Sequence, residues 1–245
     1  MSAATRSPGR PAEHEDDGLP VLDMSKPMII SAWGRKGSGK SFFNRRMYDS
    51  WVGDKLCIDV NGNADPGPDA IKITELPNRW PDPPVRPLGS PPPGPQNVEY
   101  RADPGSPDYF EDLDRAVNLA LMPQDHRTLV WCGEVAEFMP SAGTVGPSMR
   151  RLLQQNRHYN VTALFDGPRP VSIHPLVLAQ SDLIAIYHLP NPADRKRVAD
   201  SMGYPPDRFE TECAETWRRG KHWYLLWWAP EHKLFRCPPL PLDEE

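Results

Sequence analysis

The sequence has few cysteines and no long apolar run, and both features narrow what the chain can be. Its four cysteines, Cys57, Cys132, Cys213 and Cys237, have none of the paired spacings that zinc or redox sites require. No apolar run approaches the ~18 residues that span a membrane, and no basic segment followed by an apolar one opens the chain. We therefore expect a cytoplasmic protein with reduced thiols and no membrane span.

Apolar residues are also scarce, at 38% of 245 residues, although the chain is long enough for one large α/β domain. Proline accounts for much of the deficit, with 31 residues against an ordinary usage of about 5%. The net charge of −5 excludes a uniformly basic surface for nucleic acid. Any contact with DNA therefore has to come from local basic patches.

Three segments have compositions that do not favour a packed core. Residues 1–26 are rich in small, proline and charged residues, and we predict a disordered N-terminal tail. Residues 77–96 predict a surface loop of polyproline character, because proline nitrogens donate no hydrogen bonds. Residues 239–245 predict an extended acidic tail. The folded domain is therefore expected at residues 27–238.

Within that domain, short apolar runs alternate with helical patterns, which indicates an α/β fold with a mainly parallel sheet covered on both faces. Strands are predicted at residues 28–33, 55–60, 97–101, 128–132, 161–165 and 183–188. Helices are predicted at residues 40–51, 108–121, 147–158, 194–202 and 208–217. The last two apolar runs, 222–228 and 233–237, predict a C-terminal β-hairpin.

The most specific motif is G-x-x-x-x-G-K-[ST], present as Gly34-Arg35-Lys36-Gly37-Ser38-Gly39-Lys40-Ser41. A predicted strand before it and a predicted helix after it supply the context that this motif requires. Its glycines let successive N–H groups point at phosphate oxygens, and the helix N-terminus adds partial positive charge. All eight residues are therefore predicted to bind ATP. Lys40 would neutralise the β- and γ-phosphates, and the Ser41 hydroxyl would hold Mg²⁺.

Residues 27–238 resemble the FtsK/HerA-like DNA-translocating ATPases, which include DNA pumps of chromosome segregation, conjugation and virus packaging. The segments that carry the resemblance follow the family's order: 32–41 (strand and loop), 56–62 (second strand), 129–138 (acidic metal strand), 157–170 (sensor segment) and 181–189 (next strand). The resemblance implies a RecA-like P-loop fold and an ATP-driven, homo-oligomeric ring that moves or packages DNA. It also implies a viral or mobile-element origin, and a viral protein would work in the host cytoplasm.

Two positions depart from the family pattern and leave ATP hydrolysis open. Where the family has Asp-Glu at the end of the metal strand, this chain has Gly133-Glu134, so only Glu134 remains to orient the attacking water. Pro168 stands in place of the sensor Gln. Asp166 ends the strand expected between the loop strand and the metal strand, where it would supply the missing carboxylate to Mg²⁺. The alternatives are a solvated acid for Glu134 and an Asx-turn for Asp166.

Basic residues are candidates for contacts with a neighbouring subunit and with DNA. Arg157 matches the family's arginine before the sensor strand, so the resemblance implies that it enters a neighbour's site. The alternative is an exposed basic helix face. Clusters at 45–46, 195–197 and 218–221 would give sequence-independent DNA contacts, or else form solvated faces. Asp59, which ends the second strand, is expected to be structural.

The sequence thus favours an ATP-driven DNA-translocating or DNA-packaging-type ATPase. A second hypothesis is a nucleotide-binding regulatory or structural protein with little or no hydrolysis, which the residues at 133 and 168 favour. A third, a small-molecule kinase, is weaker because no Arg-rich lid segment is placed to hold a second phosphate substrate.

Overall fold

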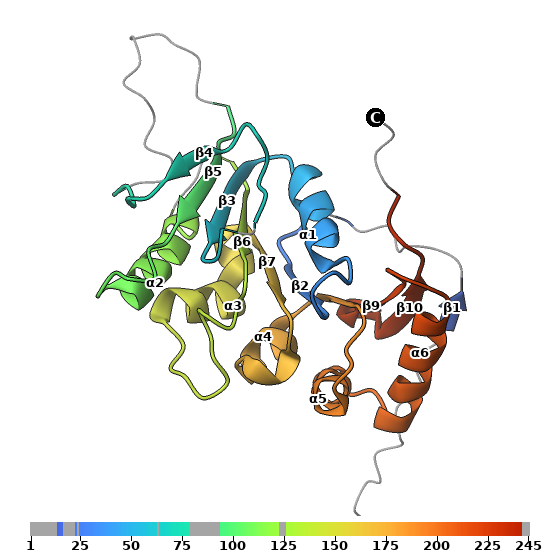
Figure 1. Cartoon of the computed structure of the whole chain (residues 1–245). Helices are drawn as coiled ribbons and strands as arrows, with labels where there is room; N and C mark the ends of the chain where they lie inside the picture. Colours follow the sequence, from blue (N-terminus) through green and yellow to red (C-terminus); the bar gives the residue numbers. More distant parts are fainter. Residues whose placement is uncertain are drawn as a thin grey trace, which may run out of the picture.

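A ten-stranded, mainly parallel sheet carries the fold in the computed structural model, which describes residues 14–16, 23, 25–62, 64–78, 94–122 and 126–241 (Figure 1). The strands of these residues follow the order β1-β10-β9-β8-β2-β7-β6-β3-β5-β4. Strands from β8 to β4 in this order run parallel, whereas β9 is antiparallel to both β8 and β10. Their bounds are β1 (His14–Asp16), β2 (Ile29–Trp33), β3 (Asp54–Asp59), β4 (Ile71–Ile73), β5 (Asn97–Arg101), β6 (Thr128–Cys132), β7 (Val161–Gly167), β8 (Leu183–Ile186), β9 (Tyr224–Trp228) and β10 (Lys233–Cys237).

Helices cover both faces of this sheet, which confirms the predicted α/β class. Helix α1 packs on one face through Phe43 and Tyr48, and the other helices pack on the opposite face (Figure 1). Neighbouring residues of β2 alternate between the two cores: Ile30 joins the core under α1, and Ile29 joins the other. The helices are α1 (Lys40–Asp49), α2 (Tyr109–Ala120), α3 (Pro147–Tyr159), α4 (Pro175–Gln180), α5 (Pro192–Met202) and α6 (Pro206–Arg218).

The predicted strands and helices are confirmed, with shifted ends, whereas β1, β4 and α4 were not predicted. Helices α5 and α6 begin two residues earlier than expected, at Pro192 and Pro206. A proline suits the first helical position, because its fixed φ is helical and the missing N–H has no intrahelical partner there. Helix α4 and strand β4 are too short to show a period in the sequence. The predicted C-terminal hairpin is present as β9 and β10.

The segments predicted to lie outside the core are only partly described. Residues 14–16 of the predicted N-terminal tail form β1, which pairs in parallel with β10. Without β1, β10 would be an edge strand with unpaired backbone N–H and C=O groups. Pairing with β1 satisfies these groups. Residues 79–93 of the predicted Pro-rich loop, residues 242–245 of the acidic tail and most of the N-terminal tail lie outside the described residues. No described helix is long and apolar enough to cross a membrane.

The topology brings three strand ends together beside the phosphate loop. Strand β7 lies between β2 and β6, as predicted, with Ala32 of β2 opposite Asp166 of β7. The strands are parallel, so the loop after β2, the loop after β6 and the end of β7 meet at one edge of the sheet. Ligands gather at such carboxyl ends.

Candidate nucleotide-binding site

The phosphate loop connects β2 directly to α1 and leaves the start of that helix open. Gly37 and Gly39 have φ values of 75° and 111°, a left-handed region that other residues rarely adopt. A Cβ on Gly39 would lie 2.9 Å from the Tyr187 ring. No side-chain hydrogen bond caps the N-terminus of α1, and its first turn carries no acid. The free N–H groups and partial positive charge of this helix end therefore remain available to an anion.

A cavity of about 490 Å³ opens on one side of the loop. Helix α1 contributes Lys40 and Ser41 to its wall, and the strand ends contribute three carboxylates. A cavity of this size is within the range of small-molecule sites. The lining residues are Lys36, Gly37, Lys40, Ser41, Asp59, Val60, Asn61, Ala64, Trp131, Gly133, Glu134, Asp166 and Pro168.

Asp166 accepts three hydrogen bonds in this cavity and is only 6% exposed. One carboxylate oxygen, Oδ2, accepts hydrogen bonds from the Asn44 amide (2.5 Å) and the Trp131 indole N–H (3.1 Å). The other, Oδ1, accepts from the backbone N–H of Glu134 (3.0 Å). Burying a charge is costly unless the charge is well hydrogen-bonded, and these three donors meet that requirement. Asp166 is therefore held rigidly and in turn fixes the backbone at Glu134.

Glu134 occupies a turn directly after β6 with a φ of 52°. The bond to Asp166 and the bond from the Val135 N–H to the Asp166 carbonyl oxygen (2.9 Å) hold this unusual conformation. Burial raises the pKa of the Glu134 carboxyl above its usual value, the nearby Asp166 charge raises it further, and Lys40 opposes the shift. A raised pKa in a cleft is typical of a proton acceptor.

The structure brings together most of the predicted site residues but not Arg157. Lys40, Ser41, Glu134 and Asp166 line the same cavity. The side chain of Arg157 is 73% exposed, and its guanidinium forms an ion pair with Asp182 (2.9 Å). Because Asp182 precedes β8, this pair lies at the amino ends of the strands, at the edge of the sheet opposite to the phosphate loop. Arg157 therefore does not contribute to the site of its own chain, and a role in a neighbour's site stays a prediction.

Three residues belong to the site although the sequence did not predict them there. Asp59, expected to be structural, lines the cavity from the end of β3. Asn44 and Trp131 bind the Asp166 carboxylate. Asn44 lies four residues after Lys40 and shares its helix face, which was a usable signal. Nothing in the sequence around Trp131 indicated its hydrogen bond, because Asp166 comes from another strand.

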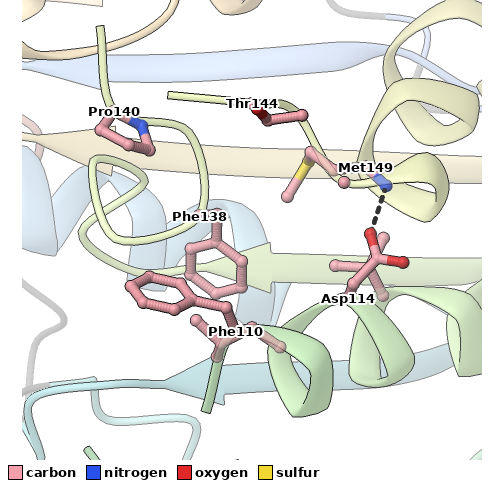
Figure 2. Close-up of a pocket in the computed structure, with 9 residues that line it drawn as sticks. Phe110, Asp114, Phe138, Pro140, Thr144 and Met149 are labelled. Atoms are coloured by element: carbon pink, nitrogen blue, oxygen red, sulfur yellow. Dashed lines mark hydrogen bonds between the residues drawn. The ribbon is translucent and has the colours of Figure 1, made fainter. Parts of the chain in front are cut away.

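Another cavity, of about 300 Å³, lies away from the phosphate loop between α2, α3 and the segment before α3 (Figure 2). Its wall is mainly apolar, and Phe110 at its rim is 69% exposed. Asp114 accepts hydrogen bonds there from the N–H groups of Ser148 (3.0 Å) and Met149 (3.3 Å), at the start of α3. Figure 2 shows the bond from Met149. This carboxylate thus caps α3 from a neighbouring helix and has a structural role.

Comparison with known proteins shows which solved structures share this fold. No protein-family model matches the sequence, and no curated protein matches it either. Among solved structures, the genome packaging NTPase B204 from Sulfolobus turreted icosahedral virus 2 is similar in its complex with AMP. The TM-score is 0.65 at 19% identity, covering 89% of this chain and 100% of that one. Its complex with AMPPCP gives a TM-score of 0.67 at 18% identity, covering 87% and 98%.

The structure of B204 described as the DNA-packaging ATPase from Sulfolobus Turreted Icosahedral Virus is also similar, with a TM-score of 0.67 at 18% identity. It covers 89% of this chain and 100% of B204. At this level of identity the likeness establishes the fold, which is that of a P-loop NTPase with additional antiparallel strands at the C-terminal side of the sheet.

Proposed function

We propose that this chain is an ATP-binding, DNA-translocating or DNA-packaging-type ATPase. The observation that carries the proposal is that Lys40, Ser41, Glu134 and Asp166 line the same cavity. The shared fold with a genome packaging NTPase supports the same conclusion. Phosphate-binding and water-orienting groups have to meet within one cavity for ATP hydrolysis.

The residues of the cavity are suited to Mg²⁺. No group of three or more His, Cys, Asp or Glu in the described part of the chain forms a metal cage. Mg²⁺ usually takes only one or two protein carboxylates and completes its shell with water and phosphate oxygens. The Ser41 hydroxyl and the Asp166 carboxylate therefore suffice to hold it, with Asp59 on the same wall. When bound, the ion would neutralise charge that develops on the phosphates.

The side chains of the chain have separable roles in this proposal. The Lys40 ammonium binds the β- and γ-phosphates, and the N–H groups of the loop cradle them. The Glu134 carboxylate orients the attacking water and accepts its proton, for which its raised pKa is suitable. Asp166 positions Glu134 through the backbone hydrogen bond (3.0 Å) and supplies the carboxylate that Gly133 cannot.

DNA contact and ring assembly are the further parts of the proposal. Two of the basic clusters are engaged within the chain: Arg45 pairs with Asp49 (2.6 Å), and Arg195 pairs with Glu210 (2.7 Å). In the third cluster, at residues 218–221, Arg218 and Arg219 are exposed and are the best candidates for contacts with DNA phosphates. In a homo-oligomeric ring, the exposed Arg157 would complete the site of a neighbouring subunit.

A second candidate function, a nucleotide-binding regulator without hydrolysis, has its own supporting observation. The Asp166 carboxylate already accepts three hydrogen bonds, and a carboxylate committed to Asn44 and Trp131 has less freedom to serve a metal. Gly133 and Pro168 also depart from the hydrolytic pattern. On this hypothesis the Asp166 bonds would serve only to shape the loop around the nucleotide.

Steady-state ATP turnover of the pure protein, measured with and without DNA, separates these functions. Turnover stimulated by DNA supports the motor, and binding without turnover supports the regulator. Lys40→Ala should abolish ATP binding without changing the melting temperature substantially, because this ammonium faces the cavity rather than the apolar core. ATP affinity that survives Lys40→Ala would contradict the phosphate-loop assignment itself.

A further inference from the structure

A second cavity borders the phosphate loop on the side opposite to the carboxylates. It measures about 370 Å³ and shares Gly37 with the cavity described above, so the loop forms the wall between them. Its other walls come from residues after β8 and from the segment that joins α6 to β9. They are Arg35, Ser38, His188, Trp217, Gly220, Lys221, His222 and Trp223.

Aromatic rings and positive charge dominate this second cavity. The His188 ring packs edge-on against Trp217, with ring centroids 4.8 Å apart. The guanidinium of Arg219 lies over the Trp223 ring, 5.0 Å from its centroid. Burial lowers the pKa of His188, and the charges of Arg35 and Arg195 lower it further, which favours the neutral form of the ring. Two indole rings and a neutral imidazole offer flat faces for a planar, electron-rich ligand.

The segment from α6 to β9 is attached to the phosphate loop itself. The His222 ring nitrogen Nδ1 lies 2.9 Å from the carbonyl oxygen of Ser38, and His222 adopts a φ of 69° to reach it. On the other wall, the backbone N–H of Arg35 donates to the His188 carbonyl oxygen (3.1 Å). The cavity and the loop therefore form one rigid unit, and a ligand of the cavity would be fixed relative to phosphates on the loop.

From this arrangement we infer that the cavity between His188 and Trp223 binds the nucleobase and ribose of the nucleotide. The inference rests on the proposed function. The γ-phosphate has to lie beside Glu134 and Asp166 for hydrolysis, so the α-phosphate and the nucleoside leave the loop on the opposite side. The cavity of His188 and Trp223 adjoins that side of the loop. Stacking on Trp217 or Trp223 would hold the base, and Lys221 and Arg35 would face the α-phosphate.

The test compares ligands with and without a base. Binding of ATP and of inorganic tripolyphosphate is measured by calorimetry for the wild type, Trp223→Ala, Trp223→Phe and, as a matched control, Phe110→Ala. Phe110 is an exposed aromatic residue remote from the loop. Trp223→Ala should weaken ATP binding by about 5- to 150-fold, the equivalent of roughly 1–3 kcal/mol of base–aromatic stacking. Tripolyphosphate binding should be unchanged, Trp223→Phe should retain most of the ATP affinity, and the control should behave as wild type.

Other outcomes overturn the inference in distinguishable ways. Equal ATP affinity in wild type and Trp223→Ala, or equal losses for ATP and tripolyphosphate, would show that the cavity does not bind the base, while the proposed function would stand. If Trp223→Ala bound a single-stranded oligonucleotide more weakly than the wild type but bound ATP equally well, the cavity would be a DNA contact instead. A wild type that binds neither ATP nor tripolyphosphate would contradict the proposed function as well.

A spectroscopic readout keeps the test valid if Trp223→Ala does not fold. Tryptophan fluorescence of the wild type should change on addition of ATP but not of tripolyphosphate, because only ATP brings a ring against the indoles. The change should be smaller in Trp223→Phe. The inference would be overturned if ATP and tripolyphosphate changed the fluorescence equally, in the wild type and in Trp223→Phe alike.

Discussion

Replacing Asp166 by Asn tests whether this buried carboxylate does more than hold the loop together. An amide has one oxygen and so cannot accept from all three present donors. If the amide oxygen keeps the bonds from Asn44 and Trp131, its NH₂ group faces the Glu134 N–H, and a buried donor loses its partner. Such a loss costs about 1–3 kcal/mol. For a domain of this size, each kcal/mol lowers Tm by about 2–4 °C.

The same substitution should lower ATP turnover by at least about 10–100-fold, the typical effect of removing a carboxylate that orients a metal's shell. Thermal melting, ATP affinity and steady-state turnover are measured together. ATP affinity should stay close to wild type in the presence of Mg²⁺, because the loop and Lys40 are intact. Asn44→Ala is the matched control: it removes one buried donor and leaves the carboxylate and its bond to Glu134. It should lower Tm with a much smaller loss of turnover.

Two results would refute this reasoning. If the wild type hydrolyses ATP and Asp166→Asn does so equally fast, Asp166 does not contribute a carboxylate to the reaction. If Asn44→Ala and Asp166→Asn lose turnover equally at equal loss of stability, the effect comes from loosening the loop rather than from the charge. In either case another acid of the cavity would have to serve the metal, and Asp59 is the one that remains on its wall.

Three further substitutions test separate features. Glu134→Gln should bind ATP but hydrolyse it slowly. In the wild type, burial raises the Glu134 pKa, so ATP turnover should decline on acidification at a higher pH than it would with an ordinary glutamate. A raised folded-state pKa means that the ionised form costs stability at neutral pH, so this variant should melt at or above the wild-type Tm. Gly133→Asp should fold normally, since a Cβ there meets only a carbonyl oxygen at 3.9 Å, and should raise turnover; lower turnover would contradict the proposed metal geometry. Asp114→Ala should lower the free energy of unfolding in urea by about 0.5–2 kcal/mol by uncapping α3, without changing ATP affinity.

Much of the fold could be predicted from the sequence because its signals are local. The apolar runs that form β2, β3, β6 and β7 are buried on both faces, and such strands are nearly continuous in apolar residues. Short elements escaped prediction: β4 has three residues and α4 has six, fewer than a periodic pattern needs. Strand β1 could not be found in a charged, low-complexity segment, since only the open edge of β10 gives it a partner.

The sequence by itself determined the phosphate loop, because the loop's glycines, lysine and serine act within eight consecutive residues and the flanking strand and helix place them. Tertiary structure alone decided the rest of the site. Asp166, Trp131 and Asn44 come from β7, β6 and α1, and no local pattern records that they share hydrogen bonds. The separation of Arg157 from the loop likewise follows from the direction of the strands, which puts residues before a strand and residues after it at opposite edges of the sheet. Hydrogen bonds between distant segments depend on how strands are ordered, and strand order is fixed by packing of the whole core.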